Sequence, residues 1–428
     1  MWIIFIALSL PASSWAFAKP CDYYLEGVFV RTFFNKNTDA LSRLVIFTEI
    51  KELMEKCPLE DLKKLDAQIE PTKKAFAEIT NKLPDDVIDA IADPTQKPYG
   101  DLDGSLGGTL TALKENFTLS SSQVNRLEHA LRGVDKRTKE VFADVNKKCE
   151  RRDHRSKIRP VDDQRNSSLC YAYSLAVEFE YKLLDRTEAI KDPISVGAIA
   201  LRYQSAHARR DENSPFKAGP TNRYGGDFNE AFEASRRYGL CRESQVSGDL
   251  RFLKAVKTVG DYQQIFPKLR VEQIKAAITP NPWETIDQLM NLACPNPIKV
   301  NHLSQAPFEV PSFRERPDLV SEVQRRLLDG EIVGFSSSSI FGHAMTVVGQ
   351  EPNPRTGICE FIVRNSYGHD CGTSRADAKL AKVFKRCDGK GNFIITPALL
   401  AENISSLHTL REMREAGRPT VPPATSAQ

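Results

Sequence analysis

The sequence lacks a large excess of charge of either sign, an internal repeat and any long apolar run beyond its first residues. Its 59 lysines and arginines are matched by 56 aspartates and glutamates, which leaves a net charge of +3. Because chains that bind nucleic acid usually carry a strongly basic surface, this balance argues against a nucleic-acid partner. No later run reaches the roughly 20 apolar residues of a membrane-spanning helix. The 428 residues therefore indicate a globular protein with room for two or three domains.

The first residues, MWIIFIALSLPASSWAFA, form a short apolar run that ends in the small-x-small pattern Ala16-Phe17-Ala18. This pattern is typical of signal peptidase cleavage, although no lysine or arginine precedes the run as in most signal peptides. The alternative is a buried N-terminal segment. We predict that residues 1–18 are a signal peptide, that the mature chain begins near Lys19, and that the protein is secreted or periplasmic.

The nine cysteines are interpreted in the light of that compartment. An oxidising environment favours disulfides, and an odd number of cysteines leaves at least one thiol over. Eight cysteines can pair in 105 ways, so the pairing does not follow from the sequence. We expect up to four disulfides and one remaining thiol.

Residues 19–150 are predicted to form an all-α region with its own apolar core. After Thr118, apolar residues recur at intervals of three and four, which is typical of one face of a helix. The members of this stripe are Val124, Leu127, Leu131, Val134, Thr138, Val141 and Val145. Further helices are expected over residues 39–56 and after Pro58, and a loop over residues 94–108.

The segment KKCERRDHRSKIR, residues 147–159, is dense in basic residues and poor in apolar ones. We interpret it as a solvated connector, and exposed polar connectors are where proteolysis concentrates. The helical region is then either a pro-segment released by a cut between Lys147 and Arg159 or a permanent accessory domain that binds a partner. The sequence leaves both possibilities open.

Beyond the connector, helices and strands are mixed. Helices are expected over residues 170–184 and 228–238, and strands over residues 331–335, 344–349 and 360–364. Residues 245–320 give no clear pattern. The tail at residues 411–428 is rich in Pro, Ala and Thr and is predicted to be disordered.

Cys170 lies where a thiol can be activated. A thiol attacks as the thiolate, and a cysteine with a pKa near ~8.5 is mostly protonated at neutral pH unless its surroundings stabilise the anion. Polar residues 166–168 precede Cys170, and Tyr171, Ala176 and Phe179 follow it with helical spacing. This pattern places Cys170 on the first turn of a helix, where backbone N–H groups favour negative charge.

A base for this thiol is suggested by His343, which begins HAMTVVGQ, and by Asn365, which ends EFIVRN. The turn-rich loop between these segments predicts an antiparallel pair of strands. Folding them symmetrically about Pro354 puts Met345 opposite Val363 and His343 opposite Asn365, on one face of the sheet. An amide beside an imidazole can fix the ring orientation while the other ring nitrogen faces a thiol.

Each of these residues alone also has a structural explanation. A cysteine in a secreted chain is usually buried or bridged, a histidine at a strand end is usually structural, and an asparagine there is usually a turn residue. A helical interaction protein with an unrelated cysteine and histidine is therefore an alternative. The combination of all three favours a nucleophilic site.

At these residues the chain resembles the papain family of cysteine peptidases. Its PVDDQRNSSLCYAYS resembles the family's PVKxQGxCGSCWAFS, with the same interval from glutamine to cysteine. GHAMTVVG resembles the family's histidine segment, FIVRNSYG its asparagine segment, and NRYGGDFNEAFEASRRYG its GCNGG stretch and following helix. Asp153-His154-Arg155 resembles the DWR that often opens the mature domain. The resemblance covers roughly residues 153–400.

The resemblance implies a role for each matching residue. Cys170 would be the nucleophile, His343 the general base and later acid, and Asn365 the residue that orients the imidazole. The side chain of Gln164 and the backbone N–H of Cys170 would form the oxyanion hole. No metal or cofactor is expected.

The resemblance also implies a fold and a cleft. A helical half and a β-rich half would form a papain-like α+β peptidase domain over residues 151–410, with an insertion around residues 245–320, preceded by the all-α region. Gly225 and Gly226 would line the cleft, where a peptide substrate hydrogen-bonds to the backbone. Tyr367 stands where the family has a tryptophan that shields the histidine–asparagine contact.

The sequence departs from the family pattern near the nucleophile. Ser167 and Arg223 replace two cysteines that form a disulfide in the family, and Arg165, Ser168 and Leu169 replace small residues. We expect an exported papain-like cysteine endopeptidase that hydrolyses peptide bonds through a thioester acyl-enzyme. The alternative is a catalytically inactive relative that binds peptides or a protein partner through the same cleft.

Overall fold

The computed structural model describes residues 33–413 apart from 36–37, 57–62, 64–66, 68, 71–72, 93–105, 165–166, 212–213, 218, 222–224, 249–255, 257, 309–315, 338–342, 370, 372–385 and 405. The predicted signal peptide lies outside the described residues. So do most of the helix expected after Pro58, most of the loop expected at residues 94–108, and residues 414–428 of the predicted tail.

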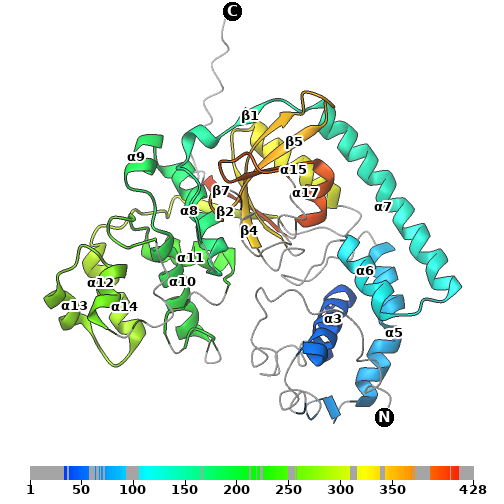
Figure 1. Cartoon of the computed structure of the whole chain (residues 1–428), viewed down its shortest axis with the longest axis horizontal. Helices are drawn as coiled ribbons and strands as arrows, with labels where there is room; N and C mark the ends of the chain where they lie inside the picture. The colour runs from blue at the N-terminus through cyan, green and yellow to red at the C-terminus, as the bar shows by residue number, and fades with distance from the viewer. Residues whose placement is uncertain are drawn as a thin grey trace, which may run out of the picture. The chain divides into compact units, whose positions relative to one another are not determined.

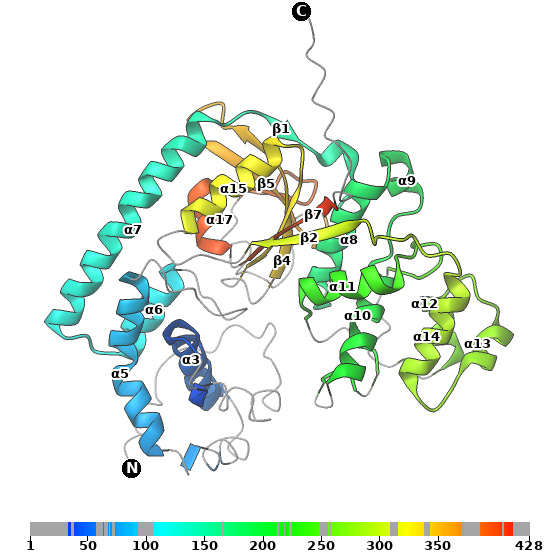
Figure 2. The same ribbon diagram turned by 180° about the vertical axis from the view of Figure 1, so that it is seen from behind.

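The chain divides into two compact units, each built from separate stretches of sequence. The first unit comprises Met1–Ser156, Pro160–Arg165 and Phe308–Leu407. The second unit comprises Lys157–Arg159, Asn166–Pro307 and His408–Gln428. Helices occur together with an antiparallel sheet, as the predicted α+β class requires. Figure 1 labels the elements, and Figure 2 shows them from behind.

Antiparallel strands form the main sheet of the first unit. They are, in order, β3 (Val333–Ser337), β4 (His343–Pro352), β5 (Cys359–Arg364) and β6 (Asn392–Ile395). The short β1 (Arg152–Asp153) also pairs with β4. The strands predicted at residues 331–335, 344–349 and 360–364 are confirmed, with ends shifted by up to three residues. β2 (Leu303–Phe308) and β7 (Ser406–Glu412), which belong mostly to the second unit, are neighbours of each other.

The helices of the first unit cover the N-terminal region and part of the sheet. They are α3 (Ala40–Lys56), α5 (Lys73–Ala92), α6 (Leu106–Asn116), α7 (Ser121–Lys147), α15 (Arg316–Leu328) and α17 (Pro397–Asn403). Helix α7 begins at a capping box in which the side chains of Ser120 and Gln123 each accept from the other's backbone N–H. The helix predicted at residues 39–56 is confirmed as α3.

Helix α7 takes part in two hydrophobic cores. Its 27 residues span about 40 Å, and Figure 1 shows it running from α5 and α6 to the strands. Leu127 and Ala130 pack in a core with α3, α5 and α6, whereas Val141 and Val145 pack in the core of the sheet. The predicted stripe is largely confirmed, but Val124 is 40% exposed. The C-terminal half of α7 is thus a structural component of the sheet core.

The segment at residues 147–159 is exposed at most of its positions, as its composition suggested, but it is fixed to the fold at others. Cys149 forms a disulfide with Cys359 of β5. His154 is buried, and its backbone N–H donates to the carbonyl oxygen of Val348 at 2.9 Å. Arg159 is buried and forms an ion pair with Glu180. The composition therefore indicated the exposure of this segment but not the contacts that hold it in place.

This arrangement predicts the outcome of a cut in the segment. Trypsin cleavage at the exposed Arg151 or Arg152 is expected to leave the two fragments joined through Cys149 and Cys359, because both sites follow Cys149. The fragments should separate on a denaturing gel only when a reductant is present. In the variant Cys149→Ser they should separate without it. Separation of the wild-type fragments without reductant would show that this disulfide does not form.

The second unit is predominantly helical. Its helices are α8 (Cys170–Leu183), α9 (Arg186–Lys191), α10 (Val196–Arg210), α11 (Phe228–Tyr238), α12 (Val259–Ile265), α13 (Val271–Ala277) and α14 (Pro282–Ala293). The predicted helices at residues 170–184 and 228–238 are confirmed as α8 and α11. The stretch at residues 245–320, which gave no clear pattern, contains α12, α13, α14 and β2. A disulfide joins Cys241 to Cys294.

A search of the described residues finds no helix with the length and apolar character needed to cross a membrane.

Candidate active site

The predicted contact between His343 and Asn365 is present in the first unit. His343 is the first residue of β4, and Asn365 follows the last residue of β5. The Nε2 atom of His343 lies 2.7 Å from Oδ1 of Asn365, and both side chains are buried. The two strands pair as expected, and they bring an imidazole and an amide together inside the protein.

The register predicted for these strands was nevertheless wrong. Val363 pairs with Val347, two residues from the predicted partner Met345, and the register shifts again between Val347 and Gly349. The prediction placed the centre of the loop at Pro354, whereas the strands pair about a point between Arg355 and Thr356; the bulge, which adds one residue to β4, offsets part of this error. The contact survives because Asn365 lies just beyond the end of β5, where its side chain reaches back to His343.

The hydrogen bonds of Asn365 determine the orientation of its amide. Its Oδ1 accepts from the backbone N–H of Ser366 at 2.8 Å, and its Nδ2 donates to the carbonyl oxygen of Cys371 at 3.4 Å. Oδ1 is therefore an acceptor, so the hydrogen bond from His343 requires a proton on Nε2. In the neutral ring, Nδ1 then carries the lone pair. This is the tautomer that a general base needs, with Nδ1 as the proton acceptor.

Tyr367 covers the histidine. Its ring is stacked on the ring of His343, with 4.9 Å between the centroids and 3° between the planes. Burial lowers the pKa of His343 to about 4, although the hydrogen bond with Asn365 acts in the opposite direction. The ring is thus neutral at pH 7, and its lone pair is available at Nδ1.

The lowered pKa of His343 predicts how stability depends on pH. The unfolded histidine takes a proton near pH 6.5, whereas the folded one takes it at about 4. Between these values the unfolded chain binds more protons, so the free energy of unfolding falls as the pH is lowered, by about 3 kcal/mol from this residue. Urea unfolding at pH 7, 5.5 and 4 measures this. The variant His343→Gln should lose part of the dependence; an unchanged dependence would contradict the buried neutral ring.

Gln164 is attached to the same segment. Its backbone N–H donates to the carbonyl oxygen of Ser366 at 2.7 Å, and the hydroxyl of Ser366 donates to its side-chain oxygen Oε1. Because Oε1 accepts this hydrogen bond, the orientation of the Gln164 amide is fixed, and its Nε2 group is the hydrogen-bond donor. Sequence reasoning found Gln164 but missed Ser366, whose backbone and hydroxyl link Gln164 to Asn365.

Cys170 belongs to the second unit, where it is the first residue of α8. Its thiol is not part of a disulfide, and the residue is 7% exposed. The first turn of the 14-residue helix contains no acidic residue, and the N-cap Leu169 forms no side-chain capping hydrogen bond. Cys170 therefore stands on the first turn of a helix, as the sequence predicted.

Gly225 and Gly226 also belong to the second unit, just before α11, but their surroundings differ. A Cβ atom at Gly225 would meet no atom of the described residues within 4 Å. A Cβ atom at Gly226 would lie 2.6 Å from the ring of Tyr171, a buried side chain next to Cys170. Gly226 therefore has a packing role that the sequence did not indicate, whereas Gly225 borders open space.

The difference between the two glycines is measurable. Gly226→Ala is expected to destabilise the protein by about 1–3 kcal/mol, because the added methyl group overlaps a buried ring that cannot easily move. Gly225→Ala, the matched control, should change the free energy of unfolding by less than about 0.5 kcal/mol. Urea unfolding of both variants checks this. Equal stability of the two would refute the packing role of Gly226.

Only some of the residues that depart from the papain pattern lie in the described part of the chain. Ser168 and the buried Leu169 directly precede α8, whereas Arg165 and Arg223 lie outside the described residues. Among the described residues, three disulfides are present, Cys149–Cys359, Cys241–Cys294 and Cys371–Cys387. The fourth disulfide of the prediction would need Cys21 and Cys57, which also lie outside the described residues.

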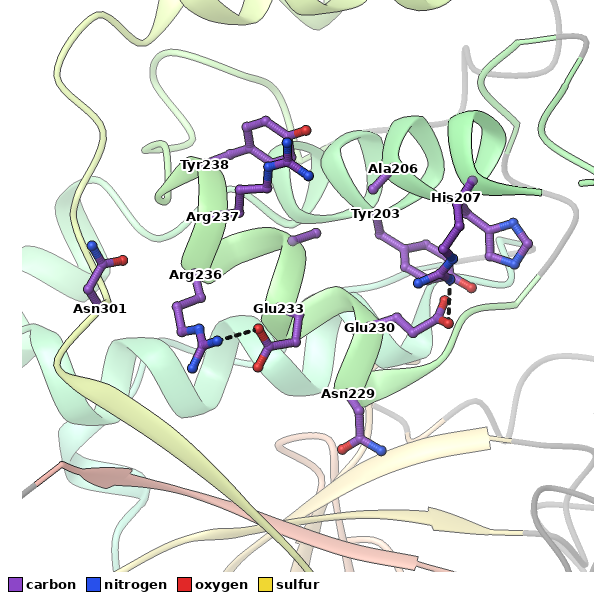
Figure 3. A pocket seen from close by; sticks show the side chains of 12 residues that line it. Tyr203, Ala206, His207, Asn229, Glu230, Glu233, Arg236, Arg237, Tyr238 and Asn301 are labelled. Carbon is purple, nitrogen blue, oxygen red and sulfur yellow. Dashed lines mark hydrogen bonds and ion pairs between the residues drawn. The ribbon is translucent and has the colours of Figure 1, made fainter. Parts of the chain in front are cut away.

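A cavity of about 760 Å³ lies between α10 and α11 in the second unit (Figure 3). Its charged side chains include two ion pairs, Arg210 with Glu230 and Arg236 with Glu233. Tyr203 also lines the cavity, and burial raises its pKa to about 12. No predicted site residue lines this cavity. Within the described part of the chain, no group of three or more His, Cys, Asp or Glu side chains could hold a metal ion.

The chain matches no protein-family model and no curated protein sequence. Among solved structures it is similar to xylellain, a cysteine protease from Xylella fastidiosa, with 16% identity and a TM-score of 0.35 over 63% of this chain and 89% of that one. Procathepsin L 3 of the Tenebrio molitor larval midgut matches at 11% identity and a TM-score of 0.34, over 91% and 99% of the chains.

A third similar structure is the proform of the ragweed pollen allergen Amb a 11, a cysteine protease. It matches at 12% identity and a TM-score of 0.36 over 65% of this chain. This chain spans 63% of the length of the ragweed protein. TM-scores of this size do not establish a shared fold, so the function has to be inferred from the residues themselves.

Proposed function

We propose that this protein is a papain-like cysteine endopeptidase in which Cys170 is the nucleophile and His343 the general base. The observation that carries the proposal is the buried hydrogen bond of 2.7 Å between Nε2 of His343 and Oδ1 of Asn365. It leaves Nδ1 as the proton acceptor, and a stacked aromatic ring shields the pair. A buried histidine needed only for packing would not require this amide-fixed tautomer.

The chemistry follows from these groups. Cys170 gives its thiol proton to Nδ1 of His343, and the sulfur attacks the carbonyl carbon of the peptide bond. The C=O electron pair moves onto oxygen. When the tetrahedral intermediate collapses, the C–N bond breaks and the leaving amine takes the proton from Nδ1. Water then attacks the thioester, gives a proton to Nδ1, and the acid and the thiol are regenerated.

The negative charge that forms on the substrate carbonyl oxygen needs hydrogen-bond donors. The Nε2 group of Gln164 and the backbone N–H of Cys170 are proposed to supply them, since Ser366 already engages Oε1 of Gln164. Removing one such donor from the oxyanion hole of another enzyme lowers kcat by about 10²–10³-fold. Gly225 is proposed to line the substrate cleft, because no atom of the described residues lies close to the position that a Cβ atom would take there.

The protein is also proposed to be exported. The observed disulfides support this, because such bonds persist in oxidising compartments and are rare in the cytosol. The helical N-terminal region is proposed to remain attached, since α7 contributes Val141 and Val145 to the sheet core. It is then an accessory region, and a cut after Cys149 would leave it attached until the disulfide with Cys359 is reduced.

The test distinguishes hydrolysis from binding without turnover. The purified full-length protein is incubated with a mixture of unstructured peptides, and new N-termini are identified by mass spectrometry. The proposal predicts new termini that accumulate with time. If peptides are retained by the protein but no new termini form, the protein is an inactive peptide-binding relative. If neither is observed, the cleft does not act on peptides.

A further inference from the structure

The first unit contains a disulfide close to the residue that orients the histidine. Cys371 and Cys387, which are 16 positions apart in the sequence, are joined. Cys371 is buried in the sheet core, whereas Cys387 is half-buried. Neither cysteine corresponds to a residue in the motifs that suggested a peptidase, so sequence reasoning gave this pair no role.

Asn365 is held by two carbonyl groups that lie on different segments. Its side-chain Nδ2 donates to the carbonyl oxygen of Cys371 at 3.4 Å. Its backbone N–H donates to the carbonyl oxygen of Gly391 at 3.2 Å. The first carbonyl belongs to the turn that follows Tyr367, and the second belongs to the turn that precedes β6. The position of Asn365 therefore depends on the relative placement of these two turns.

The disulfide joins these two turns. On one side, the backbone N–H of Cys371 donates to the carbonyl oxygen of Gly368 at 3.2 Å. On the other, Cys387 forms an antiparallel bridge with Phe393, which closes the turn that contains Gly391. The backbone N–H of Gly391 donates at 2.9 Å to the carbonyl oxygen of His369, which belongs to the first turn. The covalent bond thus reinforces a hydrogen-bonded contact between the turns.

The conformation of Cys371 supports a specific role for the bond. Among the described residues, Cys371 is the one non-glycine residue with a positive φ, at 57°. Such a conformation costs of order 1–3 kcal/mol for a side chain other than glycine, and it persists only where the surroundings enforce it. It directs the Cys371 carbonyl toward the amide of Asn365. The disulfide and the buried packing of the sulfur are the contacts that hold the residue in this conformation.

We propose that Cys371 is a positioning residue, which through its disulfide with Cys387 holds the Asn365 amide in the orientation that fixes the His343 tautomer. The effect passes from the disulfide to the Cys371 carbonyl, from there to Nδ2 of Asn365, and from Oδ1 to Nε2–H of His343. The consequence for catalysis rests on the proposed function, whereas the consequence for the histidine proton does not.

The experiment observes that proton directly. In protein labelled with ¹⁵N-histidine, the Nε2–H signal of His343 is assigned by its absence in His343→Gln, and its exchange with water is measured. In Cys387→Ser, which leaves the buried Cys371 in place, exchange should be at least about tenfold faster, because the amide that accepts the proton loses its support. If peptide hydrolysis is detected, kcat should fall while KM stays nearly constant.

Cys149→Ser is the matched control. It breaks another disulfide of the first unit, also by replacing the half-buried partner of a buried cysteine, and it should leave the exchange of the His343 proton unchanged. Equal acceleration in both variants, or none in Cys387→Ser, would overturn the proposal. If Cys387→Ser does not fold, the double variant Cys371→Ala/Cys387→Ala is measured against the same control. A failure to detect hydrolysis contradicts only the proposed function, because the proton signal is read without substrate.

Discussion

Replacement of Cys170 by alanine is expected to abolish peptide hydrolysis, with a loss of at least about 10⁵-fold in kcat, because the proposed thioester forms on the sulfur of this residue. Alanine is well suited to the first turn of α8, so the helix and the thermal unfolding temperature should be preserved. The measurement is the rate of new N-terminus formation from unstructured peptides by the wild type and the variant.

Cys387→Ser, which also removes a sulfur, is the control for a general effect of losing a cysteine. It should retain measurable turnover, whereas Cys170→Ala should not. Hydrolysis by Cys170→Ala at a rate close to that of the wild type would eliminate Cys170 as the nucleophile and leave the folded protein with another, unassigned source of activity.

Replacement of His343 by alanine is expected to reduce kcat by about 10³–10⁴-fold at pH 7. The neutral imidazole takes the thiol proton through Nδ1, and nothing else in the His343–Asn365 pair can accept it. Asn365→Ala should cost less, about 10–100-fold, because the imidazole remains and loses only its fixed orientation. Steady-state kinetics with a single cleaved peptide would measure all three proteins.

His154→Ala is the matched control for the loss of a buried histidine. His154 also lies in the first unit, where its Nε2 contacts the carbonyl oxygen of Leu327 at 3.3 Å. Its removal should alter stability but leave kcat within about threefold of the wild type in the folded protein. Equal losses in His343→Ala and Asn365→Ala, or a similar loss in His154→Ala, would contradict the separate roles assigned here.

The contact between His343 and Asn365 could be predicted because two strand-like segments flank a short, turn-rich loop. Antiparallel pairing then has to bring the two strand ends together, whatever the exact register. The register could not be predicted, because the sequence marks neither the true centre of the loop nor the bulge after Val347. The contact forms in spite of this error because it lies at the end of the strand pair, where a side chain of ordinary length can span a displacement of two residues.

Other features depend on tertiary contacts that a sequence pattern does not contain. The basic segment at residues 147–159 gave no sign that Cys149 would find Cys359, which is 210 positions away. Ser366 and Cys371 were missed because each acts on Asn365 or Gln164 through a hydrogen bond that only the folded chain creates. Helix α11 was predictable because it buries a regular apolar face and begins at the capping residue Asp227, whereas α8 is buried over most of its surface and was recognised from the helical spacing of its apolar residues.

The central claim is that one thiol, that of Cys170, is activated by His343. The measurement that tests it most directly is labelling of the folded protein at pH 7 with a peptide epoxide, followed by peptide mapping under non-reducing conditions. The account predicts one label per chain, on Cys170, and at least about a hundredfold slower labelling in His343→Ala. Labelling of a different cysteine, no labelling of the folded protein, or an unchanged rate in His343→Ala would contradict it.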